Sequence, residues 1–248
     1  AELGGGGSLM RRWPKMGATC VQIDPTRLIC GGEGTQPITM YDWQSGEVRH
    51  AFHDDQPPLG VSSSLHRAGG AVAAGNTFSR SQLRVWDLQS GVLADRFTLP
   101  GICRGVRCVQ LLPDEHALVA GCANGWVIWC DLRCGRYEKK MAHAECVNSV
   151  FVRGEKLVTS ADDGVVRITD MRTYSAIGTH RVKHIVFASC CDDERVFSGC
   201  DDGTVHMYDY SRAAAETLRV REQGGGFTSQ QKQALSAAVE SARRRADR

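Results

Sequence analysis

The sequence contains no apolar run near the ~20 residues that a membrane-spanning helix needs. It also lacks the basic and apolar regions of a secretory signal, and residues 1–8 form a Gly-rich lead that resembles a flexible linker. An excess of one charge is missing too, because 30 basic and 28 acidic residues leave a formal net charge of +2. This balance predicts no general affinity for nucleic acid or for an anionic membrane surface.

The cysteine pattern of a disulfide framework or a zinc site is also missing. The chain has 11 cysteines, an odd number, at irregular spacings and without a Cys-x-x-Cys pair. Most of them, such as Cys20 and Cys30, stand inside apolar runs, where a thiol behaves as a small buried hydrophobic group. We therefore expect no bound metal and a reducing compartment, so that the protein is intracellular, either cytoplasmic or nuclear.

Sequence signatures of catalysis are not found. There is no Gly-x-Ser-x-Gly, no phosphate-binding loop, no Gly-x-Gly-x-x-Gly that opens a helix and no His-Glu-x-x-His. Gly31–Gly34 is followed by no helical pattern and indicates a wide turn, while His53–Asp55 precedes two prolines and indicates a solvated loop. The sequence predicts no catalytic residue and no cofactor. An enzyme would instead need a titratable cluster in the centre of the fold.

A repeated dipeptide provides the first positive signal. Five segments end in an aromatic or small residue followed by Asp, and the successive Asp spacings are 45, 44, 39 and 39 residues. This period matches the ~40–45 residues of a four-stranded propeller blade. A small residue that closes an apolar run stands 11 to 13 residues before each Asp, so a second feature keeps the same register. The dipeptides are Tyr41-Asp42, Trp86-Asp87, Cys130-Asp131, Thr169-Asp170 and Tyr208-Asp209.

The last repeat shows the strands within one unit. Short segments with alternating apolar residues are separated by turns, including an Asp-Gly turn, and these are hairpin signals. We expect Ile185 and Phe187 on one side of the first strand. Because residues 17–215 show no helical periodicity, they predict five consecutive four-stranded antiparallel blades. The expected strands of the last unit are His184–Ala188, Arg195–Ser198 and Thr204–Asp209.

These residues resemble the WD-repeat (WD40) family across about residues 9–220. The segments Leu157–Asp170 and Val196–Asp209 match the second and third strands of that repeat most closely. The resemblance implies an all-β, WD40-type β-propeller. It also implies that the five visible blades are part of a seven-bladed ring.

The family has a buried tetrad of His, Ser or Thr, Asp and Trp, and two units of this chain resemble it. A buried imidazole and carboxylate are costly unless they are hydrogen-bonded, so a satisfied tetrad would fasten an outer loop to the inner strands. The third unit has Asn124 where the Asp is expected, and the first two units show no clear equivalent. The implied members are His180, Ser198, Asp202 and Tyr208 in the fifth unit, and His143, Thr159 and Asp163 in the fourth, with Thr169 where Trp is usual.

The predicted organisation is a lead at 1–8, propeller blades at 9–220, and a linker with a short basic helix at 221–248. Ser8–Trp13 and Ala213–Val220 each have the pattern of an outer strand. Two interpretations follow: earlier blades belong to the protein but not to this sequence, or Leu9–Trp13 closes a five-bladed ring. The C-terminal segment, with Thr228 as N-cap and Arg243–Arg245 near its end, predicts a solvated helix, a partner-docking helix or a basic localisation or nucleic-acid segment.

Two consecutive units end in Asp-x-Arg, which places Arg133 and Arg172 in the same register. This double motif resembles that of substrate receptors of cullin–RING ubiquitin ligases, in which the arginines face a large multi-propeller adaptor. Neither unit has Trp before the Asp, and the arginines could instead pair within their own blade. The leading hypothesis is therefore a non-enzymatic protein-interaction scaffold. The alternatives are a ubiquitin-ligase substrate receptor and a component of an RNA-associated assembly, in which the basic tail would be the nucleic-acid contact.

Overall fold

The computed structural model describes residues 18–32, 38–52, 62–76, 82–99, 103–114 and 116–210. Every regular element in these ranges is a β-strand, and the strands form five antiparallel sheets. None of the described residues forms a helix that is long and apolar enough to cross a membrane. The predicted all-β fold is therefore confirmed.

The sheets follow one another along the chain. The first contains β1 (Ala18–Ile23), β2 (Arg27–Gly32), β3 (Ile38–Asp42) and β4 (Val48–Phe52). The second contains β5 (Ser62–Ala68), β6 (Ala71–Asn76), β7 (Gln82–Asp87) and β8 (Leu93–Thr98). The third contains β9 (Val106–Leu111), β10 (Ala117–Cys122), β11 (Trp126–Asp131) and β12 (Arg136–Met141). The fourth contains β13 (Val147–Arg153), β14 (Lys156–Ala161), β15 (Val165–Asp170) and β16 (Ala176–Arg181), and the fifth β17 (Val186–Cys191), β18 (Arg195–Cys200) and β19 (Val205–Asp209).

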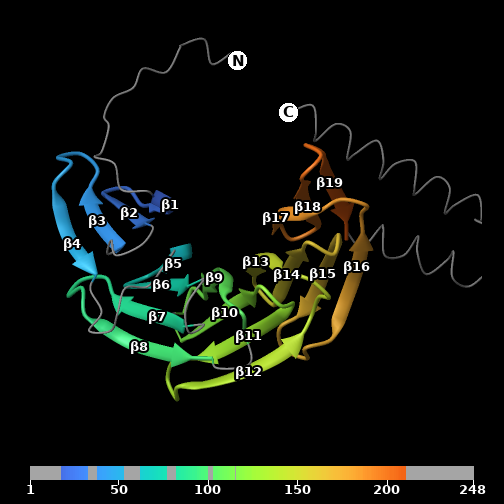
Figure 1. Cartoon of the computed structure of the whole chain (residues 1–248), viewed down its shortest axis with the longest axis horizontal. Coiled ribbons are helices and arrows are strands. Elements are labelled where there is room, and N and C mark those ends of the chain that lie inside the picture. Colours follow the sequence, from blue (N-terminus) through green and yellow to red (C-terminus); the bar gives the residue numbers. More distant parts are fainter. Residues whose placement is uncertain are drawn as a thin grey trace, which may run out of the picture.

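The five sheets are arranged as blades around an arc. The first strand of each sheet lies toward the inside of the arc, and the fourth strands β4, β8, β12 and β16 lie on its outer edge (Figure 1). The fifth sheet has three strands within the described residues. Its predicted outer strand, Ala213–Val220, lies outside them. The predicted strand at 8–13, the predicted lead at 1–8 and the predicted linker and helix at 221–248 also lie outside the described residues.

The aspartate that marks the repeat caps the turn after the third strand. Its side-chain Oδ1 accepts hydrogen bonds from backbone N–H groups two or three residues later, at 2.7–3.1 Å. This is the Asx-type turn that Asp favours because its short carboxylate can replace a backbone acceptor. The periodic Asp thus records where each third strand ends. The turns capped in this way follow Asp42, Asp87, Asp131 and Asp170.

The fourth residue after this Asp has a left-handed backbone. Gly46, Gly91 and Gly135 have φ angles of 78°, 72° and 63° there. Glycine suits the position because it has no Cβ to clash in the left-handed region. The fourth sheet differs, because Tyr174 adopts a φ of 54° at the same place. A non-glycine residue with this backbone is strained, so something else must stabilise Tyr174.

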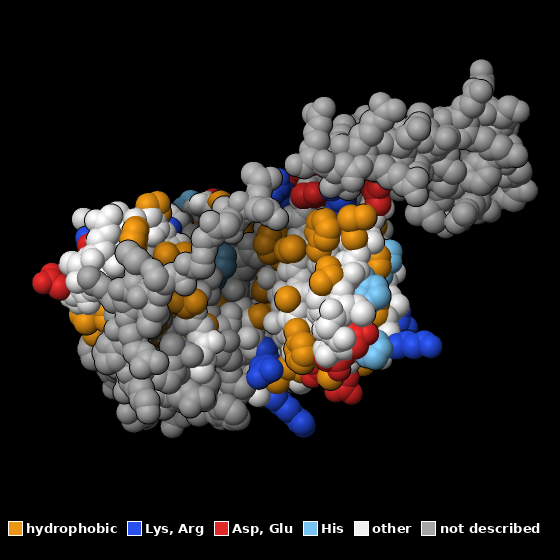
Figure 2. All heavy atoms as spheres, turned by 90° about the horizontal axis from the view of Figure 1, so that it is seen from above, with side chains coloured by type: hydrophobic (Ala, Val, Ile, Leu, Met, Phe, Trp, Pro, Cys, Tyr) orange, Lys and Arg blue, Asp and Glu red, His pale blue; other side chains and the backbone are white. Residues whose placement is uncertain are grey.

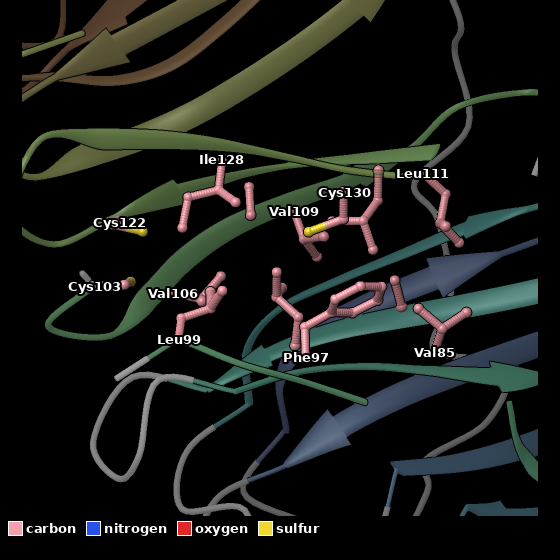
Figure 3. Close-up of a cluster of buried hydrophobic side chains, with 14 residues drawn as sticks. Val85, Phe97, Leu99, Cys103, Val106, Val109, Leu111, Cys122, Ile128 and Cys130 are labelled. Atoms are coloured by element: carbon pink, nitrogen blue, oxygen red, sulfur yellow. The ribbon is translucent and has the colours of Figure 1, made fainter. Parts of the chain in front are cut away.

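The sheets are held together by apolar side chains packed between neighbouring blades. Between the second and third sheets, Phe97 belongs to a buried apolar cluster that also includes Val106, Leu111 and Ile128 (Figure 3). Similar clusters lie between the first and second, third and fourth, and fourth and fifth sheets. This packing follows from the near-continuous apolar runs of the second and third strands, which are buried on both sides by neighbouring blades.

Polar side chains of the innermost strands bond to the next blade. The backbone N–H of Leu111 donates to Nδ1 of His66 (3.1 Å), and Ser64 Oγ accepts from the N–H of Val109 (2.9 Å). Gln110 accepts from the N–H of Val152 (2.7 Å) and donates to its carbonyl (3.1 Å). These bonds satisfy the buried polar groups and fix the register between blades.

The first strand of the fifth sheet departs from the sequence prediction. It runs from Val186 to Cys191, where we expected His184–Ala188, and Val186 is buried while Phe187 is exposed. Ile185, which we expected on the same side of this strand as Phe187, instead precedes its first residue. A bulge between Val186 and Ala188 shifts the register against β18.

The last sheet exposes residues that are buried in the sheet before it. Val166 and Ile168, four and two residues before their Asp, are 0% and 1% exposed because the fifth sheet covers them. Val205 and Met207 hold the same positions in β19 and are 72% and 58% exposed. Figure 2 shows the hydrophobic side chains that gather on this sheet. An exposed apolar blade face of this kind is an aggregation hazard.

The buried histidine network and the candidate partner-binding rim

Three predicted tetrad residues of the fourth unit are hydrogen-bonded to one another. His143 lies between β12 and β13, Thr159 is on β14, and Asp163 is in the turn before β15. His143 Nδ1 lies 3.1 Å from Asp163 Oδ1, and its Nε2 lies 2.8 Å from Thr159 Oγ1. Asp163 also accepts from the backbone N–H groups of Ala144 and Val165, both at 3.0 Å. The network therefore ties the link between blades to the inner strands of the fourth blade.

Burial and hydrogen bonding shift the pKa values of His143 and Asp163. Burial lowers the pKa of His143, and the nearby Asp163 carboxylate opposes this shift without reversing it. Burial would raise the pKa of Asp163, but hydrogen bonds from Ala144, Val165 and His143 outweigh it, so this pKa is lowered. Because a carboxylate only accepts, Nδ1–H donates to Asp163 and the Thr159 hydroxyl donates to Nε2 of the neutral ring. Such a network stabilises the blade by satisfying its buried polar groups.

The predicted tetrad of the fifth unit is not assembled, and this prediction is wrong. His180 lies on β16, stacks on Tyr208 with ring centroids 3.8 Å apart, and hydrogen-bonds to the hydroxyl of Tyr210 through Nε2. Asp202 instead accepts from the N–H and hydroxyl of Thr204. The buried hydroxyl of Ser198 has no hydrogen-bond partner among the described residues.

Spacing explains the error. His143 precedes Asp163 by 20 residues, whereas His180 precedes Asp202 by 22 and falls inside the outer strand. Twenty residues before Asp202 stands Val182, whose backbone N–H bonds to the carbonyl of Gly164 much as the N–H of His143 bonds to that of Gly125. An apolar side chain therefore occupies the tetrad-histidine position, and it packs against the cluster between the last two blades.

One exposed group of possible metal ligands lies in the fifth sheet. Ligand atoms of His184, Asp201 and Asp202 lie within 4.8 Å of one another. All three side chains are exposed, and Asp202 already serves the turn to Thr204. Structural zinc sites use four ligands, usually buried, so we assign no metal here.

The predicted partner-binding arginines lie on one rim of the arc. In an antiparallel sheet, the turns after the first and third strands lie at the same end. We call this end the Asp-turn rim; it contains the turns after β3, β7, β11 and β15 and the turns after β1, β5, β9, β13 and β17. Arg133 and Arg172 each stand two residues after the capping Asp, in neighbouring blades.

The two arginines differ in what their side chains contact. The Arg133 guanidinium bonds to both carboxylate oxygens of Asp131, with Nε–Oδ1 at 3.2 Å and Nη2–Oδ2 at 2.9 Å. This hydrogen-bonded guanidinium lowers the pKa of Asp131 to about 2. The exposed Arg172 guanidinium makes no hydrogen bond to any residue that the structure describes. Only its backbone N–H bonds to Asp170, at 2.8 Å.

A cavity of about 260 Å³ opens beside Arg133, between the second and third blades. Its walls come from β6, β7 and β8 on one side and from the turns after β9 and β11 on the other. Apolar and charged side chains share the lining, which the sequence alone did not reveal because it joins residues of two repeats. The lining residues are Gly70, Ala71, Val85, Trp86, Asp87, Ala94, Asp95, His116, Leu132 and Arg133.

Antiparallel blades around a central arc, with capped turns on one rim, define a β-propeller. Residues 173–209 match the family model "WD domain, G-beta repeat". The chain is similar to autophagy-related protein 16 of Arabidopsis thaliana, 28% identical over 187 residues that make up 71% of this chain and 35% of that protein. It is also similar to WD repeat-containing protein SL1-17 of Schistosoma mansoni, 24% identical over 54% of this chain and 58% of that protein.

Solved structures show the same fold. The β-propeller domain of Cps50 (Swd1) from Myceliophteria thermophila superposes with a TM-score of 0.69 at 14% identity, and the match covers 81% of this chain and 68% of that one. The repeat, the blades and these similarities make the chain a WD-repeat β-propeller protein. It spans between about a third and three fifths of the length of the two relatives.

Proposed function

We propose that this chain is a non-enzymatic protein-interaction module that binds its partners on the Asp-turn rim. The observation that carries the proposal is the shared construction of this rim. Each of four consecutive blades has one turn that is capped by an Asp at the equivalent position of the repeat. The exposed side chains of these turns are therefore presented in fixed register on a rigid support. Loops held on a rigid scaffold are where binding residues concentrate.

The chemistry of the rim suits a protein partner. Arg133 and Arg172 are exposed on neighbouring blades, and a guanidinium can form bidentate bonds with carboxylates or carbonyl oxygens. The cavity between the second and third blades adds a concave, partly apolar site beside Arg133. Interfaces are commonly built from such a pocket surrounded by polar contacts.

Recognition of a ubiquitin-ligase adaptor would require both arginines to face outward. Arg172 has a free guanidinium among the described residues, whereas that of Arg133 is engaged by Asp131. An exposed pair of this kind contributes only about 0–1 kcal/mol, so a partner could displace it. The general scaffold function therefore stands first, and adaptor binding is a more specific form of it.

The test is partner capture with matched variants. The full-length protein carrying Arg133→Ala and Arg172→Ala is compared with one carrying Arg181→Ala and Lys183→Ala, which alter exposed cations at the opposite end of β16. We expect the rim variant to lose its main partners and the control to retain them, with equal thermal stability. Equal capture by both variants would contradict the proposal. Selective loss of a multi-propeller adaptor would identify the ligase function.

A further inference from the structure

At the seam between the third and fourth blades, aromatic side chains of both blades pack against each other near the Asp-turn rim. Trp129, two residues before its Asp, meets Tyr174 from the next blade edge to face, with ring centroids 5.5 Å apart at 85°. Lys140 Nζ donates to the Tyr174 carbonyl at 2.7 Å, and Met171 packs against the apolar cluster that also includes Trp129. These contacts stabilise the left-handed backbone of Tyr174.

The preceding seam has small residues in the same two positions. Val85 stands two residues before Asp87, where the next blade has Trp129, and Gly135 stands four residues after Asp131, where the next blade has Tyr174. A Cβ added at Gly135 would meet no atom within 4 Å. Both large rings of one seam are therefore absent from the other, and the cavity of about 260 Å³ lies there, with Val85 in its wall.

The cavity also contains an acceptor without a partner. Asp95, on β8, is half-buried, and within the described ranges it makes no hydrogen bond or ion pair. Burial raises the pKa of this carboxyl. The other acidic residue of the lining, Asp87, is already used to cap the turn at Gln89 and Ser90. Asp95 is thus the acceptor that remains available to a ligand.

We propose that this seam cavity receives a tryptophan or tyrosine side chain of a protein partner, whose N–H or O–H donates a hydrogen bond to Asp95. The proposal rests on the proposed function and names the chemistry of its partner. Val85, Leu132 and Ala94 provide apolar walls for the ring, as Trp129 does for Tyr174 at the next seam.

Size and hydrogen-bonding capacity both favour this occupant. The cavity is smaller than the ~300–1,000 Å³ typical of sites for small molecules, so it suits a single side chain. Buried tryptophan and tyrosine need a hydrogen-bond partner for their polar atom, and these residues dominate the energetics of interfaces. The lining contains two carboxylates, Asp87 and Asp95, and one guanidinium, that of Arg133, so a cationic probe must be tested beside the aromatic ones.

The test measures binding of four probes to the protein by NMR of its methyl groups: indole, p-cresol, toluene and n-butylamine. Indole and p-cresol carry a ring and a donor, toluene only the ring, and n-butylamine only a cation. We expect indole and p-cresol to shift the methyl signals of Val85 and Leu132 at millimolar concentration. We also expect toluene to bind about tenfold more weakly, because it cannot bond to Asp95.

Two variants on the same strand locate the site. Ala94→Trp places a large ring at the cavity wall, whereas Thr98→Trp alters an exposed position of β8 outside the lining. The first should abolish probe binding and the second should leave it unchanged. Asp95→Ala should weaken indole about tenfold, to the affinity of toluene.

Several outcomes would overturn the proposal. These are the absence of shifts at Val85 and Leu132, equal binding of toluene and indole, preferential binding of n-butylamine, and binding that survives Ala94→Trp. In partner capture, Ala94→Trp should remove a partner that Thr98→Trp retains, and retention by both would also overturn it. Because probe binding needs no partner, failure here is distinguishable from failure of the rim arginines to bind one.

Discussion

Removing the His143 imidazole should destabilise the protein because it leaves a buried hydroxyl without a partner. His143 and Thr159 are each 2% exposed, so water cannot replace the lost bond without entering the blade. An unsatisfied buried hydroxyl costs about 1–3 kcal/mol. The space left by the ring adds about 1–2 kcal/mol at roughly 24 cal/mol per Å³ of residual cavity.

His143→Ala should therefore lower the free energy of unfolding by about 2–5 kcal/mol, measured by urea denaturation. Asp163 limits the loss, because it keeps the bonds from Ala144 and Val165. His180→Ala is the control: it removes one bond to Tyr210 and a ring stack, for about 0.5–1.5 kcal/mol. His184→Ala, at an exposed site, should cost less than about 0.5 kcal/mol.

A double-mutant cycle isolates the bond itself. Thr159→Val replaces the hydroxyl with a methyl of similar size, so the pair His143→Ala and Thr159→Val leaves no orphaned hydroxyl. The double variant should be about 1–2 kcal/mol more stable than the sum of the single losses predicts. Additivity within about 0.3–0.5 kcal/mol would refute this reasoning, because uncoupled residues behave in that way.

Three further predictions concern the turn, the open face and pH. Tyr174→Ala should lower the free energy of unfolding by about 1–3 kcal/mol, because the variant keeps the left-handed strain and loses the Trp129 contact. Tyr174→Gly should lower it less, because glycine relieves the strain; equal shifts of the melting temperature would argue against strain. The double variant Val205→Thr and Met207→Gln should reduce light scattering by aggregates without changing the free energy of unfolding. The matched variant Val166→Thr and Ile168→Gln should lower that free energy by about 1–3 kcal/mol or more, because both side chains are buried. Similar losses of stability in the two variants would mean that the β19 face is covered. Burial lowers the pKa of His66, His143 and His180 from 6.5, so the unfolded state binds more protons than the folded state near this pH. The free energy of unfolding should therefore be highest above pH 6.5 and should fall as the pH is lowered below that value. A urea midpoint that does not change between about pH 7 and 5 would contradict this.

The blades were predictable from the sequence because their signals are local and repeated. Each capping Asp acts within its own turn, so its period directly records blade length. The bulge at Val186–Ala188 was not predictable, because one extra residue in a strand leaves the alternation of its neighbours ambiguous. The expected tetrad of the fifth unit was wrong because the residue type matched and the spacing did not. His180 precedes its Asp by 22 residues, whereas His143 precedes its Asp by 20.

The candidate site was only partly predictable. The common register of Arg133 and Arg172 follows from the repeat, but the ion pair that engages only Arg133 depends on side-chain geometry. Tyr174 could have been found by comparing units, since it stands where three units have Gly. The cavity could not, because its walls join residues about 20 to 60 positions apart that meet only when blades pack.

Amide hydrogen exchange of the protein, with and without its main captured partner, would test most directly where that partner binds. Each blade has turns at both ends, so every blade supplies its own control. We expect protection in the turns at 88–92, 132–135 and 171–175, on the Asp-turn rim. Protection confined to the opposite turns at 123–125, 162–164 and 201–203 would contradict binding on this rim.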